Sequence, residues 1–88
     1  LRPAAGKVVE ARPTIRAAIR DMGAGIGREK DIELVLDGRS ILAEYDPDAG
    51  LVHGHLPEDL LPGQHNLLVR VRDMSGNQAE VRSEFEVR

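Results

Sequence analysis

Hydrophobic and polar residues alternate with a period of two along most of the chain after residue 13. This is the pattern of a β-strand with one buried face, because successive side chains of a strand point to opposite faces. The stretch TIRAAIRD at 14–21 places Ile15, Ala17 and Ile19 on one face. Its strict alternation and its β-branched residues favour a strand over two turns of helix.

The same alternation predicts further strands, and it assigns a face to each residue within them. We expect strands near 31–36, 40–45, 51–56, 64–73 and 78–88, after a short edge strand at 7–11. The side chains expected to face inward are Ile15, Ala17, Ile19, Ile32, Leu34, Leu36, His65, Leu67, Val69, Val71, Ala79, Val81, Phe85 and Val87. The opposite faces carry mainly charged residues, as in antiparallel sheets that are solvated on one side.

Turn-forming residues separate these strands. Asp37-Gly38 stands between two apolar runs, which is a strong signal for a tight hairpin. Gly76 is placed to supply the positive φ of a second turn. The segment 46–50 is also turn-forming, whereas 57–63 is a longer connection in which we expect one helical turn. Short strands with turns every 8–12 residues or so indicate an all-β sandwich or a small barrel.

The length and composition of the chain limit the number of domains and the classes of function. The 88 residues suffice for one small domain, which we place at 7–88 after a linker remnant at 1–6. The first residue is Leu1 rather than Met, so we expect a piece of a longer protein. The net charge is −3 with interspersed signs, which argues against nucleic-acid binding. No apolar stretch approaches the ~20 residues of a membrane span, and the chain has no Cys for a disulfide.

The chain resembles the immunoglobulin-like modules of large bacterial secreted and surface proteins, including their fibronectin-III-like relatives. The resemblance rests on RPTIRAAIRDMGAGI at 12–26, IELVLDGRSI at 32–41 and a long final run from residue 43. Within that run, LLPGQHNLLVRVRDMSGN at 60–77 matches most closely, and a last strand ending in Phe-x-Val follows it.

The resemblance implies an immunoglobulin-like Greek-key β-sandwich of about seven antiparallel strands, extracellular or cell-surface placement, and no catalysis. The periplasm is the alternative compartment. The implied role is that of a structural spacer between neighbouring domains of the same chain, with the segment near residue 7 and Arg88 at opposite poles. The alternatives are a module that binds Ca²⁺, a glycan or a protein through its loops, and an accessory domain of a secreted hydrolase. We expect no nucleic acid and no membrane insertion.

The phrase Arg-Asp-Met occurs twice, at 20–22 and at 72–74, each time after an apolar run. The fold implied by the resemblance brings both stretches to one pole, in neighbouring loops. We expect Asp21 and Asp73 to accept hydrogen bonds from the backbone of their own loops. The alternative is a weak Ca²⁺ site formed by Asp21, Asp73 and Asn77, because calcium binds carboxylate and amide oxygens. Apart from this cation, we expect no cofactor.

Two further groups of residues are candidate sites. Gly63 and His65 stand where such sandwiches carry a corner residue, and we expect the His65 ring to bond the backbone near 59–62. His53 and His55 share a strand face and could together chelate zinc, but we expect a structural role on the outer face.

Catalysis finds little support in the sequence. The serines lack the strand-turn-helix elbow of a hydrolase nucleophile, and the paired carboxylates lie on outward strand faces. We therefore expect that the domain is not an enzyme.

Overall fold

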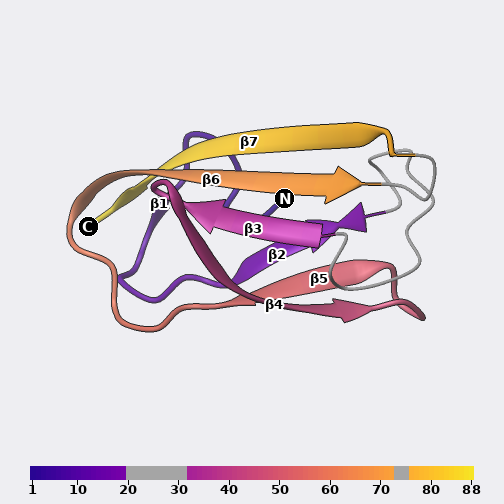
Figure 1. Ribbon diagram of the computed structural model, residues 1–88. Coiled ribbons are helices and arrows are strands. Elements are labelled where there is room, and N and C mark those ends of the chain that lie inside the picture. Colours follow the sequence, from indigo (N-terminus) through magenta and orange to yellow (C-terminus); the bar gives the residue numbers. More distant parts are fainter. Residues whose placement is uncertain (20–31, 73–75) are drawn as a thin grey trace.

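The computed structural model describes residues 1–19, 32–72 and 76–88. These residues form seven strands and contain no α-helix, which confirms the all-β class and the strand number (Figure 1). The strands are β1 (Val8–Val9), β2 (Ile15–Ala18), β3 (Ile32–Leu36), β4 (Arg39–Asp46), β5 (Leu51–His55), β6 (Gly63–Arg72) and β7 (Gln78–Val87).

The seven strands form one curled sheet in the order β1-β7-β6-β3-β4-β5-β2. Strand β4 changes its partner along its length: residues 39–41 pair with β3, and residues 42–46 pair with β5. The change divides the sheet into two halves. One half holds β7, β6 and β3, and the other holds β5 and β2 (Figure 1).

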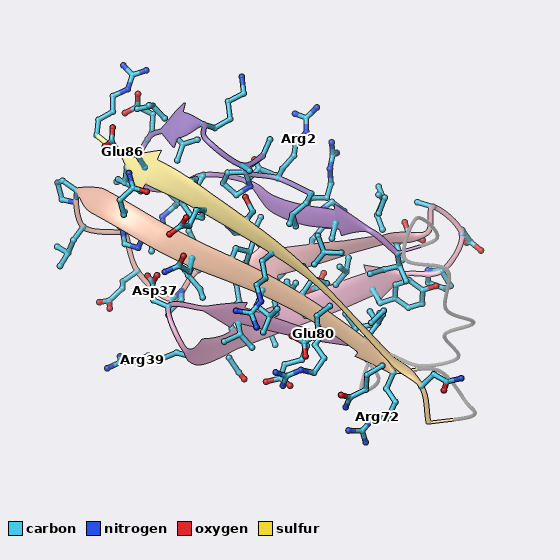
Figure 2. The ribbon with its side chains drawn as sticks, turned by 90° about the horizontal axis from the view of Figure 1, so that it is seen from above. Arg2, Asp37, Arg39, Arg72, Glu80 and Glu86 are labelled. Atoms are coloured by element: carbon cyan, nitrogen blue, oxygen red, sulfur yellow. The ribbon has the colours of Figure 1, made fainter. Side chains whose placement is uncertain are left out.

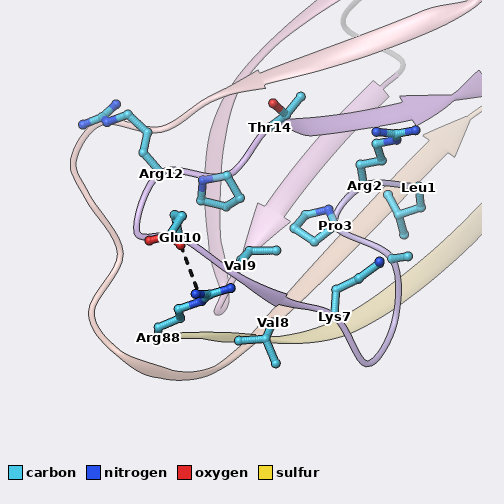
Figure 3. Close-up of a pocket in the computed structure, with 12 residues that line it drawn as sticks. Leu1, Arg2, Pro3, Lys7, Val8, Val9, Glu10, Arg12, Thr14 and Arg88 are labelled. Atoms are coloured by element: carbon cyan, nitrogen blue, oxygen red, sulfur yellow. Dashed lines mark ion pairs between the residues drawn. The ribbon is translucent and has the colours of Figure 1, made fainter.

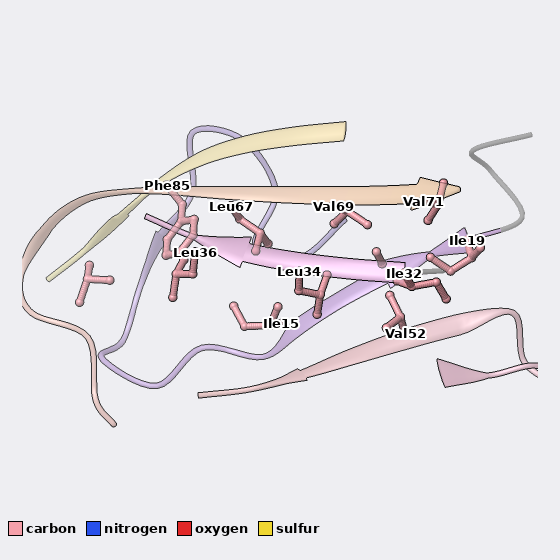
Figure 4. Close-up of a cluster of buried hydrophobic side chains, with 12 residues drawn as sticks. Ile15, Ile19, Ile32, Leu34, Leu36, Val52, Leu67, Val69, Val71 and Phe85 are labelled. Carbon is pink, nitrogen blue, oxygen red and sulfur yellow. The ribbon is translucent and has the colours of Figure 1, made fainter. Parts of the chain in front are cut away.

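The core lies between these two halves (Figure 4). Its twelve buried hydrophobic residues are Ile15, Ala17, Ile19, Ile32, Leu34, Leu36, Val52, Leu67, Val69, Val71, Phe85 and Val87. The inward assignment from the sequence is therefore confirmed for most positions. Val81 departs from it, because 39% of its surface remains exposed on the edge of the sheet.

The predicted Asp37-Gly38 hairpin joins β3 to β4. Both residues have positive φ, 52° for Asp37 and 84° for Gly38, which is the geometry of a type I′ turn. Such a turn matches the natural twist of the two strands, so it fixes the register in which Leu36 faces Arg39.

The connection before β6 differs from its prediction, because residues 57–62 form no helical turn. Prolines at 57 and 62 restrict the backbone at both ends of this short segment. The amide N–H of Leu60 donates to Ala11 O at 2.7 Å instead of closing a local turn. The expectation of one helical turn is wrong.

The first strand also departs from expectation. β1 pairs with β7 in parallel, with Val8 beside Glu86, so the sheet is mixed rather than fully antiparallel. Lys7 O accepts a hydrogen bond from Glu86 N at 2.9 Å, and Arg88 N donates to Val9 O at 3.1 Å. Residue 7 and Arg88 thus lie at one pole, and their expected placement at opposite poles is wrong (Figure 1). Because the two strands pair in parallel, β1 runs toward the same pole as β7.

Residues 1–6, which the sequence indicates as a linker, lie against the sheet. Arg2 and Arg16 exchange two backbone hydrogen bonds, of 2.7 and 3.0 Å. Pro3 is buried, and its carbonyl accepts a 2.6 Å bond from the buried Ser83 hydroxyl. Gly6 N donates to Glu84 O at 2.8 Å. The segment therefore contacts both β2, at one end of the strand order, and β7, next to its other end.

Candidate functional site

The most connected polar site is a corner formed by His65 on β6 and Asp37 in the β3–β4 turn. The Nε2 atom of His65 lies 2.7 Å from Leu61 O, within the 59–62 stretch to which the sequence assigns its partner. The Nδ1 atom lies 2.5 Å from Asp37 Oδ2. Gly63, two residues earlier, has a φ of 124° and lets the chain turn into β6.

Asp37 connects this corner to the hairpin. Its Oδ1 accepts the N–H of Asn66 at 2.8 Å, and its own N–H donates to Asn66 O at 2.8 Å. The sequence assigns Asp37 a turn-forming role only. Its contact with His65 was missed because it depends on the register of β3 against β6, which places Leu36 beside Leu67. The dipeptide Asp37-Gly38 does not by itself predict how β3 aligns with β6.

The chemistry of the corner constrains the protonation of His65. Both ring nitrogens face acceptors, a carboxylate and a carbonyl oxygen, and only a doubly protonated imidazole donates to both. Burial lowers the pKa of His65. The hydrogen bonds to Asp37 and to Leu61 O, with the charge of Asp37, outweigh burial and raise the pKa above 6.5. The ring also stacks on Phe85, with centroids 5.8 Å apart.

The structure describes one of the three candidate calcium residues. Asp21 and Asp73 fall outside the described residues, whereas Asn77 directly precedes β7. Gly76, beside it, has a φ of 87°, which is the positive φ that the sequence predicts for it. Strands β2 and β6 run toward the same end of the molecule (Figure 1). Within residues 1–19, 32–72 and 76–88, no three His, Asp or Glu side chains are arranged to hold a metal ion.

The paired histidines of β5 lie outside the core. His53 is partly exposed and His55 exposed, while Val52, between the two halves of the sheet, is buried, so the outer-face assignment agrees with the structure. The Nε2 atom of His55 lies 3.5 Å from Glu44 Oε1 on the neighbouring strand. His55 therefore takes part in a surface contact between β4 and β5.

A cleft of about 680 Å³ lies beside the first residues of the chain (Figure 3). Its walls are apolar at Pro3, Val8 and Val9, and its rim carries several cations. Two of these are paired: Arg88 with Glu10 at 3.4 Å, and Arg12 with Asp59 at 2.7 Å. The cleft is thus a cationic part of the surface. Its described lining residues include no pair of titratable side chains suited to proton transfer.

The described serines are engaged in structural bonds. The Ser83 hydroxyl donates to Pro3 O, and Ser40 Oγ donates to Glu33 Oε1 at 2.8 Å. In the described ranges, each of these two hydroxyls donates to an oxygen acceptor, a backbone carbonyl for Ser83 and a carboxylate for Ser40.

Searches with the chain against models of protein families, curated proteins and solved structures give no match. In the part of the chain that the structure describes, no helix is long and apolar enough to cross a membrane.

Proposed function

We propose that this domain is a non-catalytic structural module of a larger exported protein, with an immunoglobulin-like Greek-key arrangement. It holds neighbouring parts of the chain at a fixed spacing and carries tension between them. The extracellular or cell-surface placement rests on the sequence resemblance alone.

The observation that carries this proposal is the parallel pairing of β1 with β7. Tension applied to the two ends of the chain pulls β1 back toward residue 1 and pulls β7 forward beyond Arg88. In a parallel pair these forces slide the strands past each other. The bonds Glu86 N to Lys7 O and Arg88 N to Val9 O are then loaded together rather than one after another.

Further contacts reinforce the same joint. The Glu10–Arg88 ion pair of 3.4 Å crosses it, although both side chains are largely exposed and contribute little to stability. The reciprocal backbone bonds of Arg2 and Arg16 anchor the incoming segment to β2 as well. Tension at the first residue therefore reaches both halves of the sheet.

Single-molecule force measurements test the proposal. The chain has no Cys, so a pair of introduced cysteines defines where force is applied. We compare handles at residues 1 and 88 with handles at Gln64→Cys and Arg88→Cys. The second pair pulls β6 and β7 apart from one end, because Gln64 lies opposite Glu86 in an antiparallel ladder.

We expect a clearly higher unfolding force for handles at the two ends, at equal loading rate, because forced unfolding is governed by the unfolding barrier along the pulling direction. Equal or lower force at the ends would remove the load-bearing role. The load-bearing role would also be refuted if the chain unfolded at the same force after removal of residues 1–9.

A further inference from the structure

Strand β7 has a long edge that the described structure leaves open. β6 pairs with all of β7, from Gln78 to Val87. On the other side, β1 pairs only with Glu86 and Val87. Within residues 1–19, 32–72 and 76–88, no strand pairs with the outer edge of residues 78–83. An open edge of this kind is a ready site for pairing with another strand.

The backbone direction along this edge follows from the bonds near its end. Glu86 N and Arg88 N donate outward to Lys7 O and Val9 O, and Glu84 O accepts outward from Gly6 N. Backbone groups of alternate residues point to the same side of a strand. Glu80 and Arg82 therefore present their N–H and C=O groups outward, on either side of Val81, whose side chain is 39% exposed.

We propose that this edge binds a second copy of the same chain, with the two β7 strands antiparallel and centred on Val81. In this register Glu80 of each copy lies opposite Arg82 of the other, and the two Val81 side chains face each other. Opposite charges at directly facing positions stabilise a sheet, and like charges destabilise it. The registers centred on Glu80 or on Arg82 keep the backbone bonding but bring like charges together.

A row of alternating charge across the sheet supports this register. Glu33 on β3, Arg70 on β6 and Glu80 on β7 occupy directly facing positions. Arg70 Nη1 lies 3.5 Å from Glu33 Oε2, and Arg70 Nε lies 3.4 Å from Glu80 Oε1. Glu80 ends the row at the open edge, on the outer face of β7 (Figure 2). Arg82 of the second copy would continue the alternation as its fourth member.

The contact is small. Each Glu80–Arg82 pair supplies two backbone hydrogen bonds, so the ladder holds about four. It stops at Glu84, whose carbonyl already accepts from Gly6. Because stable interfaces usually bury more than about 1,000 Å², we expect weak association, in the high micromolar to millimolar range.

Charge reversal tests the register. Glu80→Arg and Arg82→Glu each bring like charges together twice, and we expect each to weaken self-association by roughly tenfold or more. An equimolar mixture of the two variants restores opposite charges at both positions, so it should associate at least as well as the unmodified chain. Sedimentation equilibrium up to a few millimolar measures this. Arg39→Glu, on a different part of the surface, is the matched control and should change nothing.

Glu80 also contacts Arg70 and Arg82 of its own chain, at 3.4 and 3.6 Å, so both variants change contacts within one copy as well. Each variant is therefore first compared with the unmodified chain by circular dichroism and thermal melting. A second measurement needs no variant: on dilution, the NMR amide signals of residues 80–82 should shift while those of β4 and β5 stay constant. A monomeric chain at several millimolar, or variants that associate like the unmodified chain, would overturn the proposal. The proposal would also be overturned if the mixture of the two variants associated no better than either variant alone.

Discussion

Replacing His65 by Leu removes both hydrogen bonds of the corner while keeping an apolar side chain over Phe85. Asp37 Oδ2 and Leu61 O then lose their donors. A buried polar group left unpaired costs about 1–3 kcal/mol. The Asp37 side chain is 40% exposed, so water reaches it and the lower part of that range applies. Loss of the ring stack on Phe85 adds about 0.5–1.5 kcal/mol. We expect a loss of about 2–3 kcal/mol at pH 6.

The pH dependence separates this mechanism from a loss of packing. The folded state raises the pKa of His65 above 6.5, so the stabilisation is complete below pH 6.5 and declines as pH rises through the folded-state pKa. The free energy of unfolding of the unmodified chain should therefore fall with rising pH, by about 1.4 kcal/mol for a tenfold difference between the proton affinities of the folded and unfolded states. His65→Leu lacks this component, so the difference between the two proteins shrinks as the pH rises.

Urea denaturation from pH 5.5 to 9 measures this difference, and NMR titration of the ring gives the pKa directly. His53→Gln, on the outer face, is the matched control and should keep the pH dependence of the unmodified chain. A His65 pKa at or below 6.5 would refute the reasoning. A stability loss that is the same at pH 5.5 and pH 9 would show that packing, not the charged ring, carries the effect.

Two further predictions concern a packing contact at Gly54 and the hydrogen bond of the buried Ser83. Gly54→Ala places a Cβ 2.7 Å from Ile15 Cγ2 and 2.9 Å from Ile41 Cδ1, so we expect a loss of about 1–3 kcal/mol in urea denaturation. Adding Ile41→Val should recover part of it, and strict additivity would contradict the clash. Ser83→Ala leaves Pro3 O without its donor and should cost about 1–3 kcal/mol, with faster hydrogen exchange at Arg2 and Gly6. Ser40→Ala, an exposed control, should cost less than about 0.5 kcal/mol, and equal losses would argue against the Pro3 contact.

The strands could be predicted from the sequence because their signal is local. Ile15, Ala17 and Ile19 are buried as the period of two requires, and Asp37-Gly38 forms the turn that its two residues favour. Each of these outcomes depends on neighbours within a few positions along the chain. Local propensity and burial therefore pointed to the same structure at those positions.

The pairings that join distant segments were harder to infer. The parallel contact of Val8 with Glu86 depends on where the chain must go next, and two apolar residues give no sign of strand direction. The sequence predicts a helical turn within residues 57–62, yet the backbone N–H of Leu60 donates to Ala11, about fifty positions away. The partner of His65 among residues 59–62 could be anticipated, since it lies four positions away, whereas Asp37 could not.

The change of partner within β4 has a consequence for how the domain folds. One continuous backbone fixes Ile41 against Leu34 in one half of the sheet and Leu42 against His55 in the other. If β4 slipped by one residue against β3, it would also slip by one residue against β5. The slip would separate Tyr45 from its partner Val52 and would turn the side chains of β4 to the opposite face. Neither half can therefore settle into a misaligned arrangement alone. We expect the two halves to form and to melt as one cooperative unit.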